Sequence, residues 1–229
     1  MKTIGMLGGM SWESTQSYYR AINQGINAAL GGFHSARILM YSVDFAEIEA
    51  LQRQGDWDRM AEILARAAGA VKAGGADFLI ICTNTMHKVV PQIQAEIDIP
   101  ILHIADATAE VLTRDGVARV GLLGTRFTME QAFYRERLEA SGIQVLVPDE
   151  EGRALIHDVI YQELCQGVVR EESREAYLEV VEAMARRGAE AVVLGCTEIG
   201  LLIQSSDTRV PLYDTTEIHA AQAVARAID

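Results

Sequence analysis

Short apolar runs alternate along the chain with longer amphipathic stretches. Apolar runs bounded by glycine or proline are typical of buried strands, and apolar positions three and four residues apart are typical of helices. The clearest helical spacing runs from Trp57 to Ala73, where Met60, Leu64 and Val71 fall on one face. The alternation predicts βα units around mostly parallel sheets. We expect strands at Thr3–Leu7, Ala36–Ser42, Phe78–Cys82, Ile101–Ile104, Val120–Leu123, Gln144–Val147, Ala191–Leu194 and Leu212–Tyr213.

An internal repeat underlies this pattern. The run Ile4-Gly5-Met6-Leu7-Gly8 returns as Val120-Gly121-Leu122-Leu123-Gly124, and residues 75–83 align without a gap on residues 188–196. Both of these longer runs then lead to a proline followed by an apolar strand. Chance is the alternative explanation, since all βα proteins share apolar strands bounded by glycine. Three matches in the same order favour a duplication.

A duplication in a chain of 229 residues predicts an α/β fold with two similar, pseudo-symmetric domains. We place the N-terminal domain at residues 1–112 with 213–229 and the C-terminal domain at residues 113–212. Each is expected to hold a mostly parallel sheet flanked by helices.

The composition excludes some classes of binding partner and some cellular locations. The formal charge of −12 argues against nucleic acid, which needs a basic face. No run approaches the roughly 18 continuous apolar residues of a membrane span, and the first residues lack the pattern of a signal peptide. Three widely spaced cysteines fit reduced thiols, and the five histidines show no metal-ligand spacing. We expect a cytoplasmic protein without a metal site or a membrane partner.

Thr83 and Cys196 occupy matching positions in the repeat, each directly after a predicted strand. Ligands of open α/β sheets bind beyond the carboxyl ends of strands. Asn84, Thr85 and Thr197 supply hydrogen-bonding groups suited to a carboxylate there. Because a helix N-terminus lowers the pKa of a thiol, we expect Cys196 to be a base or nucleophile. The alternative is a small buried residue that closes an apolar strand.

Other residues near these positions carry less specific signals. Cys82 faces away from Thr83 if the strand continues, so we expect it in the core. Cys165 lies in a helical stretch, where packing or a supporting role is expected. His87 is expected to orient or pack rather than to transfer a proton. The glycine-rich run at residues 5–11 matches neither a dinucleotide fingerprint nor a P-loop, so we interpret it as a turn that opens a substrate pocket.

Three motifs follow one another in order and span essentially the whole chain: Ile4-Gly5-Met6-Leu7-Gly8-Gly9-Met10, Asn84-Thr85-x-His87 and Gly195-Cys196-Thr197-Glu198. Together they resemble the aspartate/glutamate racemase family, which works without pyridoxal phosphate. The resemblance implies two similar α/β domains facing each other across a cleft that holds the active site, no cofactor, and a homodimer. It also implies that one side chain removes the α-proton of an amino acid while another returns a proton on the opposite face.

The first site departs from the family pattern. That pattern reads Cys-Asn-Thr, whereas this chain has Thr83-Asn84-Thr85 with Cys82 one place early. A threonine hydroxyl is far less acidic than a thiol, so Thr83 is a poor base that can still deliver or relay a proton. We therefore expect an unequal catalytic pair. Cys196 removes the α-proton, by family analogy from the L-enantiomer, and the reverse reaction is slower.

The sequence is compatible with either an acidic or a neutral side chain on the substrate. Basic residues are expected to hold a distal carboxylate, yet Cys165 occupies about the position where a basic residue is expected. Arg126 is the remaining candidate cation. We expect interconversion of L- and D-aspartate or glutamate, or of a broader set that includes neutral amino acids such as homoserine. The residues expected to bind the substrate are Met10, Gln52, Asn84, Thr85, Met86, Thr125, Cys165 and Thr197.

Two other functions compete with racemisation. One is an isomerase or decarboxylase of a carboxylic acid, in which Cys196 acts alone as nucleophile or proton donor. The other is a non-catalytic protein that binds a small molecule, because Thr83 replaces one of the two usual catalytic thiols.

Overall fold

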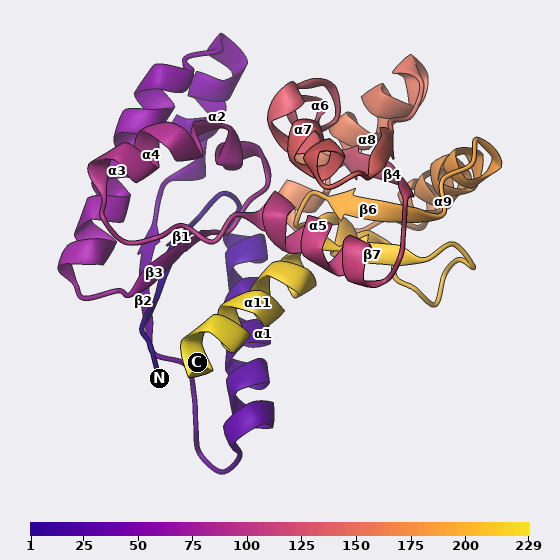
Figure 1. The fold of residues 1–229 in the computed structure, drawn as a ribbon. Helices are drawn as coiled ribbons and strands as arrows, with labels where there is room; N and C mark the ends of the chain where they lie inside the picture. The colour runs from indigo at the N-terminus through magenta and orange to yellow at the C-terminus, as the bar shows by residue number, and fades with distance from the viewer. The chain divides into compact units, whose positions relative to one another are not determined.

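The computed structural model describes every residue from Met1 to Asp229. The chain divides into two compact units, residues 1–104 with 219–229 and residues 105–218, called here the first and the second unit. Each unit has its own parallel sheet with helices packed against it (Figure 1). The chain leaves the first unit after Ile104 and re-enters it at His219.

The sheet of the first unit has three parallel strands in the order β2-β1-β3. Its central strand, β1 (Ile4–Gly8), pairs with β2 (Ile38–Ser42) and β3 (Phe78–Ile81). Every residue of β1 and β3 is buried, as is usual where helices cover both faces of a parallel sheet. The helical segments are α1 (Trp12–Leu30), α2 (Phe45–Gln54), α3 (Trp57–Ala73), η1 (Thr85–Val89), α4 (Val90–Glu96) and most of α11 (Thr215–Ile228).

The two faces of this sheet belong to two apolar clusters. Leu7 and Leu79 pack on one face with the buried side of α3, and Met6 and Ile80 pack on the other face with α1 and α11. Figure 1 shows α1 and α11 together on one side of the sheet and α2, α3 and α4 on the other. The alternation of side chains along the strands thus explains both layers.

The sheet of the second unit has four parallel strands in the order β5-β4-β6-β7. Its central strands are β4 (Arg119–Gly124) and β6 (Ala191–Gly195), and its edges are β5 (Gln144–Leu146) and β7 (Leu212–Asp214). A buried apolar cluster joins β4 and β6 to α8 and α9. The helical segments are α5 (Ile104–Arg114), α6 (Arg126–Glu130), α7 (Ala132–Ala140), α8 (Glu150–Gln162), η2 (Leu164–Gln166), α9 (Glu171–Arg186), α10 (Ile199–Leu202) and the start of α11.

Matching positions of the repeat make matching contacts. Asp77 and Glu190 each accept backbone N–H groups at the start of the central strand of their own sheet. Two residues earlier, Gly75 and Gly188 have φ angles of 98° and 95°, which L side chains rarely adopt. The aligned segments therefore turn from helix into strand in the same way, which supports the duplication.

The α/β class with two parallel sheets is confirmed, as is the helix from Trp57 to Ala73. The predicted strand Ile101–Ile104 is wrong: only Ile101 bridges to Leu79, and α5 begins at Ile104. A side chain takes the backbone donor that the next step of the ladder would need: the Leu102 N–H still bonds to the Leu79 carbonyl, but His87 accepts the Ile104 N–H. The other predicted strands form, with ends that either match or differ by one or two residues.

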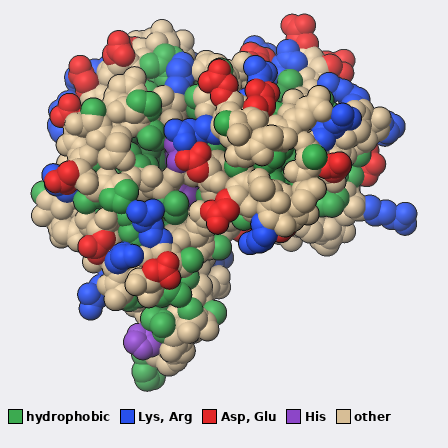
Figure 2. All heavy atoms as spheres, in the orientation of Figure 1, with side chains coloured by type: hydrophobic (Ala, Val, Ile, Leu, Met, Phe, Trp, Pro, Cys, Tyr) green, Lys and Arg blue, Asp and Glu red, His purple; other side chains and the backbone are tan.

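No helix combines the length and the apolar character that a membrane crossing requires. Acidic and basic side chains are intermixed over the face shown in Figure 2.

Replacing Gly75 by alanine is predicted to lower the free energy of unfolding by about 1–2 kcal/mol, because a Cβ at φ 98° strains the backbone. A Cβ there meets no neighbouring atom, so no steric clash adds to the effect. Gly69→Ala is the matched control: this site is equally open but lies within α3, where alanine stabilises by up to about 1 kcal/mol. Urea unfolding of the three proteins measures both effects, and a stabilised Gly75→Ala protein contradicts the backbone argument.

Candidate active site

Cys196 follows β6 directly, beside the end of β4. Gly195 of β6 pairs with Gly124 of β4, and a Cβ on either glycine would lie within 2.8 Å of a backbone oxygen of the opposite strand. Glycine at both positions therefore lets the two strands end this close together. Thr125, the next residue after β4, is buried and caps α6 by accepting the N–H of Thr128. Thr125 and Cys196 thus share the carboxyl edge of the second sheet.

A buried carboxylate holds the Cys196 thiol. The Cys196 Sγ donates to Glu198 Oε2 over 3.0 Å, and the Thr197 hydroxyl donates to the same oxygen over 2.8 Å. All three residues are buried. The carboxylate gains two hydrogen bonds that partly replace the water it has lost, and the thiol gains an adjacent proton acceptor.

The thiol of Cys196 is protonated at rest, which corrects the expectation of a lowered pKa. Burial raises its pKa well above the ordinary value, and the Glu198 charge, the Cys165 thiol and the hydrogen bond to Glu198 raise it further. The expected opposing effect of a helix N-terminus is small because α10 has a single turn, Ile199–Leu202. Cys196 therefore needs a base before it can act as one.

Cys165 and Tyr177 belong to the surroundings of Cys196. Cys165 lies in η2 and packs against the same apolar cluster that includes Cys196. The buried Tyr177 donates to the Ile156 carbonyl, and burial followed by the nearby Cys196 raises its pKa well above the ordinary value. Apolar packing on this side keeps water away from the thiol.

Thr83 lies just beyond β3 of the first unit. The Cys82 N–H still bonds to Leu7 of β1, but the carbonyls of Cys82 and Thr83 bond to side chains, those of Ser14 and His87. Thr83 is buried apart from 9% of its surface. The end of the ladder thus marks the point where the chain turns from strand into the residues expected to bind the substrate.

Cys82 is a core residue, as the strand alternation predicted. It is fully buried in the apolar cluster formed with α1 and α11, and burial raises the pKa of its thiol far above the ordinary value. Its side chain therefore lies on the face of the sheet covered by those helices, and it has no direct part in the Thr83 site.

The residues expected to bind the substrate are divided between the two units. In the first unit, Met10 follows β1, Asn84, Thr85 and Met86 follow β3, and Gln52 lies buried on α2. The second group, Thr125, Cys165 and Thr197, lies around Cys196 as described above.

Glu198 is the residue of this site that sequence reasoning missed, although it belongs to the Gly-Cys-Thr-Glu motif. The available signal was an acidic residue two positions after the candidate thiol.

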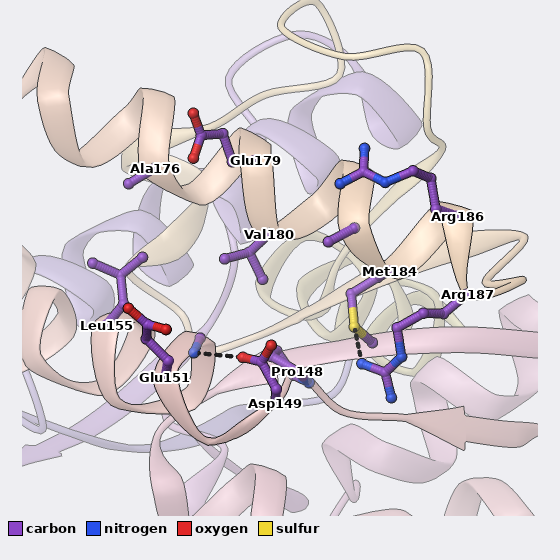
Figure 3. Close-up of a pocket in the computed structure, with 12 residues that line it drawn as sticks. Pro148, Asp149, Glu151, Leu155, Ala176, Glu179, Val180, Met184, Arg186 and Arg187 are labelled. Carbon is purple, nitrogen blue, oxygen red and sulfur yellow. Dashed lines mark hydrogen bonds between the residues drawn. The ribbon is translucent and has the colours of Figure 1, made fainter.

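A separate groove on the second unit contains none of these residues. It has a volume of about 420 Å³ and lies between the start of α8 and α9 (Figure 3). Asp149 caps α8 at its edge, and Arg187 is held there by Val147 and Met184. These two charged groups are thus engaged in local structure. Elsewhere, no group of three or more His, Cys, Asp and Glu side chains is placed to hold a metal ion.

Comparison with known proteins gives consistent matches over the whole chain. The Asp/Glu/Hydantoin racemase family model matches residues 7–223. The broad specificity amino-acid racemase RacX of Bacillus subtilis is 22% identical over 227 residues, 96% of each chain. A Yersinia pestis structure assigned as an Asp/Glu racemase is 51% identical, with a TM-score of 0.92 and full coverage of both chains. PH1733 of Pyrococcus horikoshii, an aspartate racemase homologue, is 33% identical, with a TM-score of 0.87 and full coverage of both.

Glu198→Gln is predicted to lower the pKa of Cys196, because it removes both the negative charge and the carboxylate that holds the thiol proton. The pKa stays above the ordinary value, since burial is the larger cause. The pH dependence of Cys196 alkylation, in a background with Cys82 and Cys165 changed to alanine, measures the shift.

Glu175→Gln makes the same chemical change at an exposed position of α9 and serves as the control. An alkylation profile for Glu198→Gln that stays in place or moves to higher pH contradicts the assignment.

Proposed function

Because the chain belongs to the Asp/Glu/Hydantoin racemase family, we propose that it is a cofactor-independent amino-acid racemase with Cys196 as its main acid/base and Thr83 as the opposing residue. The observation that carries this proposal is the buried hydrogen bond from the Cys196 thiol to Glu198. A protonated thiol beside an acceptor is suited to moving a proton in both directions.

The proton steps balance if Glu198 serves as the store. Glu198 Oε2 takes the thiol proton, and the resulting Cys196 thiolate removes the α-proton of the amino acid, leaving a carbanion and a neutral thiol. Thr83 then delivers a proton to the opposite face and regains one from solvent, while Glu198 returns its stored proton to solvent. The L-enantiomer becomes the D-enantiomer, and Cys196, Thr83 and Glu198 all end in the protonation states in which they began.

Unequal acidity of the two groups leads to unequal turnover. A thiol with a nearby base removes a proton more readily than a threonine hydroxyl does. The value of kcat is therefore larger in the direction in which Cys196 removes the α-proton. Enantiomers have equal free energies, so kcat/KM must be the same in both directions. The asymmetry expected from the sequence therefore appears as a higher kcat, matched by a higher KM, for the enantiomer that Cys196 deprotonates.

Two observations support a substrate range that includes acidic amino acids and extends beyond them. RacX has broad specificity, and the matching family is that of Asp/Glu/Hydantoin racemases. Arg126, the first residue of α6, is exposed directly after Thr125 and can meet a distal carboxylate. We include aspartate, glutamate and neutral amino acids such as homoserine.

A panel of L-amino acids incubated in deuterated water without cofactor tests the reaction. We expect α-deuterium incorporation together with formation of the D-enantiomer, and Cys196→Ser to lower both rates at least about a hundredfold. Mass spectrometry and chiral chromatography measure them. Decarboxylation, or isomerisation of another acid, points to the single-cysteine alternative. Binding without exchange points to the non-catalytic one.

Thr83→Cys is predicted to bring the two kcat values closer together, because the second position then carries a thiol as the repeat leads one to expect. Initial rates from each enantiomer at saturation measure the two values. Thr83→Val, of the same shape but without the hydroxyl, is expected to lose racemisation. A Thr83→Val enzyme that racemises as the wild type does excludes Thr83 as the second proton-transfer residue.

A further inference from the structure

His87 is a buried histidine whose two ring nitrogens both bond to the backbone. Nδ1 lies 2.7 Å from the Thr83 carbonyl oxygen, and Nε2 accepts the Ile104 N–H over 3.2 Å. A carbonyl only accepts and a backbone N–H only donates, so the ring carries its proton on Nδ1 and a lone pair on Nε2. His87 is therefore neutral, and both ring nitrogens are engaged by backbone groups.

The carbonyl groups on either side of the Thr83 Cα are held by buried side chains. The sheet no longer orders the backbone here, because β3 ends at Ile81. Ser14 Oγ donates to the Cys82 carbonyl over 3.2 Å, and His87 Nδ1 donates to the Thr83 carbonyl. Because the orientations of these two peptide groups set the backbone angles of Thr83, they also set the direction of its Cα–Cβ bond.

The second half of the repeat closes the same turn without a histidine. The residue aligned with His87 is Gly200, and the carbonyl of Cys196 bonds to the backbone N–H of Ile199 over 3.1 Å. Turn formation alone therefore does not require the imidazole. What His87 adds is a link from Thr83 to Ile104, where the chain leaves the first unit.

Packing fixes the ring of His87 against two other histidines. Its centroid lies 4.5 Å from that of His103 and 5.8 Å from that of His219. The nitrogens of His219 bond to Tyr18 and to the Leu102 carbonyl, so neither reaches Thr83. Burial lowers the pKa of His219 to about 4, which keeps this neighbour uncharged near neutral pH.

We propose that His87 is a positioning residue: its Nδ1–H holds the Thr83 carbonyl and thereby aims the Thr83 hydroxyl at the substrate. This rests on the proposed function, because it takes Thr83 as the second proton-transfer residue. Removing the contact then impairs protonation on the Thr83 face and spares the deprotonation by Cys196. Solvent exchange with retention, which needs Cys196 alone, separates the two steps.

The test compares two substitutions that each keep one half of the ring's bonding. His87→Asn keeps a donor near the position of Nδ1, and His87→Gln keeps an acceptor near that of Nε2. The substrate is the L-amino acid that the wild type racemises fastest, in deuterated water. The measured quantity is the rate of D-enantiomer formation divided by the rate of deuterium incorporation into the L-enantiomer.

We expect His87→Gln to lower this ratio about a hundredfold, as for a misplaced reacting group, and His87→Asn to lower it less than about tenfold. His219→Asn, the control from the same cluster, lowers stability and leaves the ratio unchanged. Equal ratios in the wild type and both His87 variants, or equal losses in the two variants, overturn the proposal. A wild-type protein that exchanges the α-hydrogen of no amino acid contradicts the proposed function instead.

A measurement on the unmodified protein guards against variants that fail to fold. Nitrogen-15 NMR of the histidine rings is expected to show His87 neutral and protonated on Nδ1, as its two hydrogen bonds require. A ring protonated on Nε2, or on both nitrogens, overturns the proposal whatever the variants do.

Discussion

The hydrogen bond between the Cys196 thiol and the Glu198 carboxylate is the interaction on which the rest of the site depends. A buried carboxylate is costly unless donors surround it, and here the thiol and the Thr197 hydroxyl both donate to one oxygen. The same charge makes the thiol a weaker acid and gives its proton a place to go. The close ends of β4 and β6, which only glycine permits, bring Thr125 and Cys196 to one edge of the sheet.

The two halves of the duplicated backbone differ in the groups that close the turns after their matched strands. Matched glycines, prolines and acidic residues build both sheets in the same way, yet the turns that follow are closed by different groups. A backbone N–H closes the turn at Cys196, and an imidazole closes the one at Thr83. Divergence is thus concentrated in the residues after the strands, where chemistry is decided, and the scaffold stays common.

Elements governed by local periodicity and by the repeat were predictable from the sequence. The helix Trp57–Ala73, the central strands and the core position of Cys82 follow from which side chains share a face. The strand at Ile101–Ile104 was not predictable in this way, because His87, 17 residues earlier in the sequence, takes the Ile104 N–H that the ladder would need. The raised pKa of Cys196 was missed for a similar reason: it depends on burial and on where Glu198 folds back, which periodicity does not encode.

In the proposed reaction, Glu198 accepts the Cys196 proton. The initial rate of α-deuterium incorporation into the best L-amino acid by the wild type, Glu198→Gln and Glu175→Gln tests this step. We expect a loss of at least about a hundredfold in Glu198→Gln, within the range for removal of a proton-transfer group, and wild-type rates in Glu175→Gln. Wild-type exchange by a folded Glu198→Gln protein would contradict it.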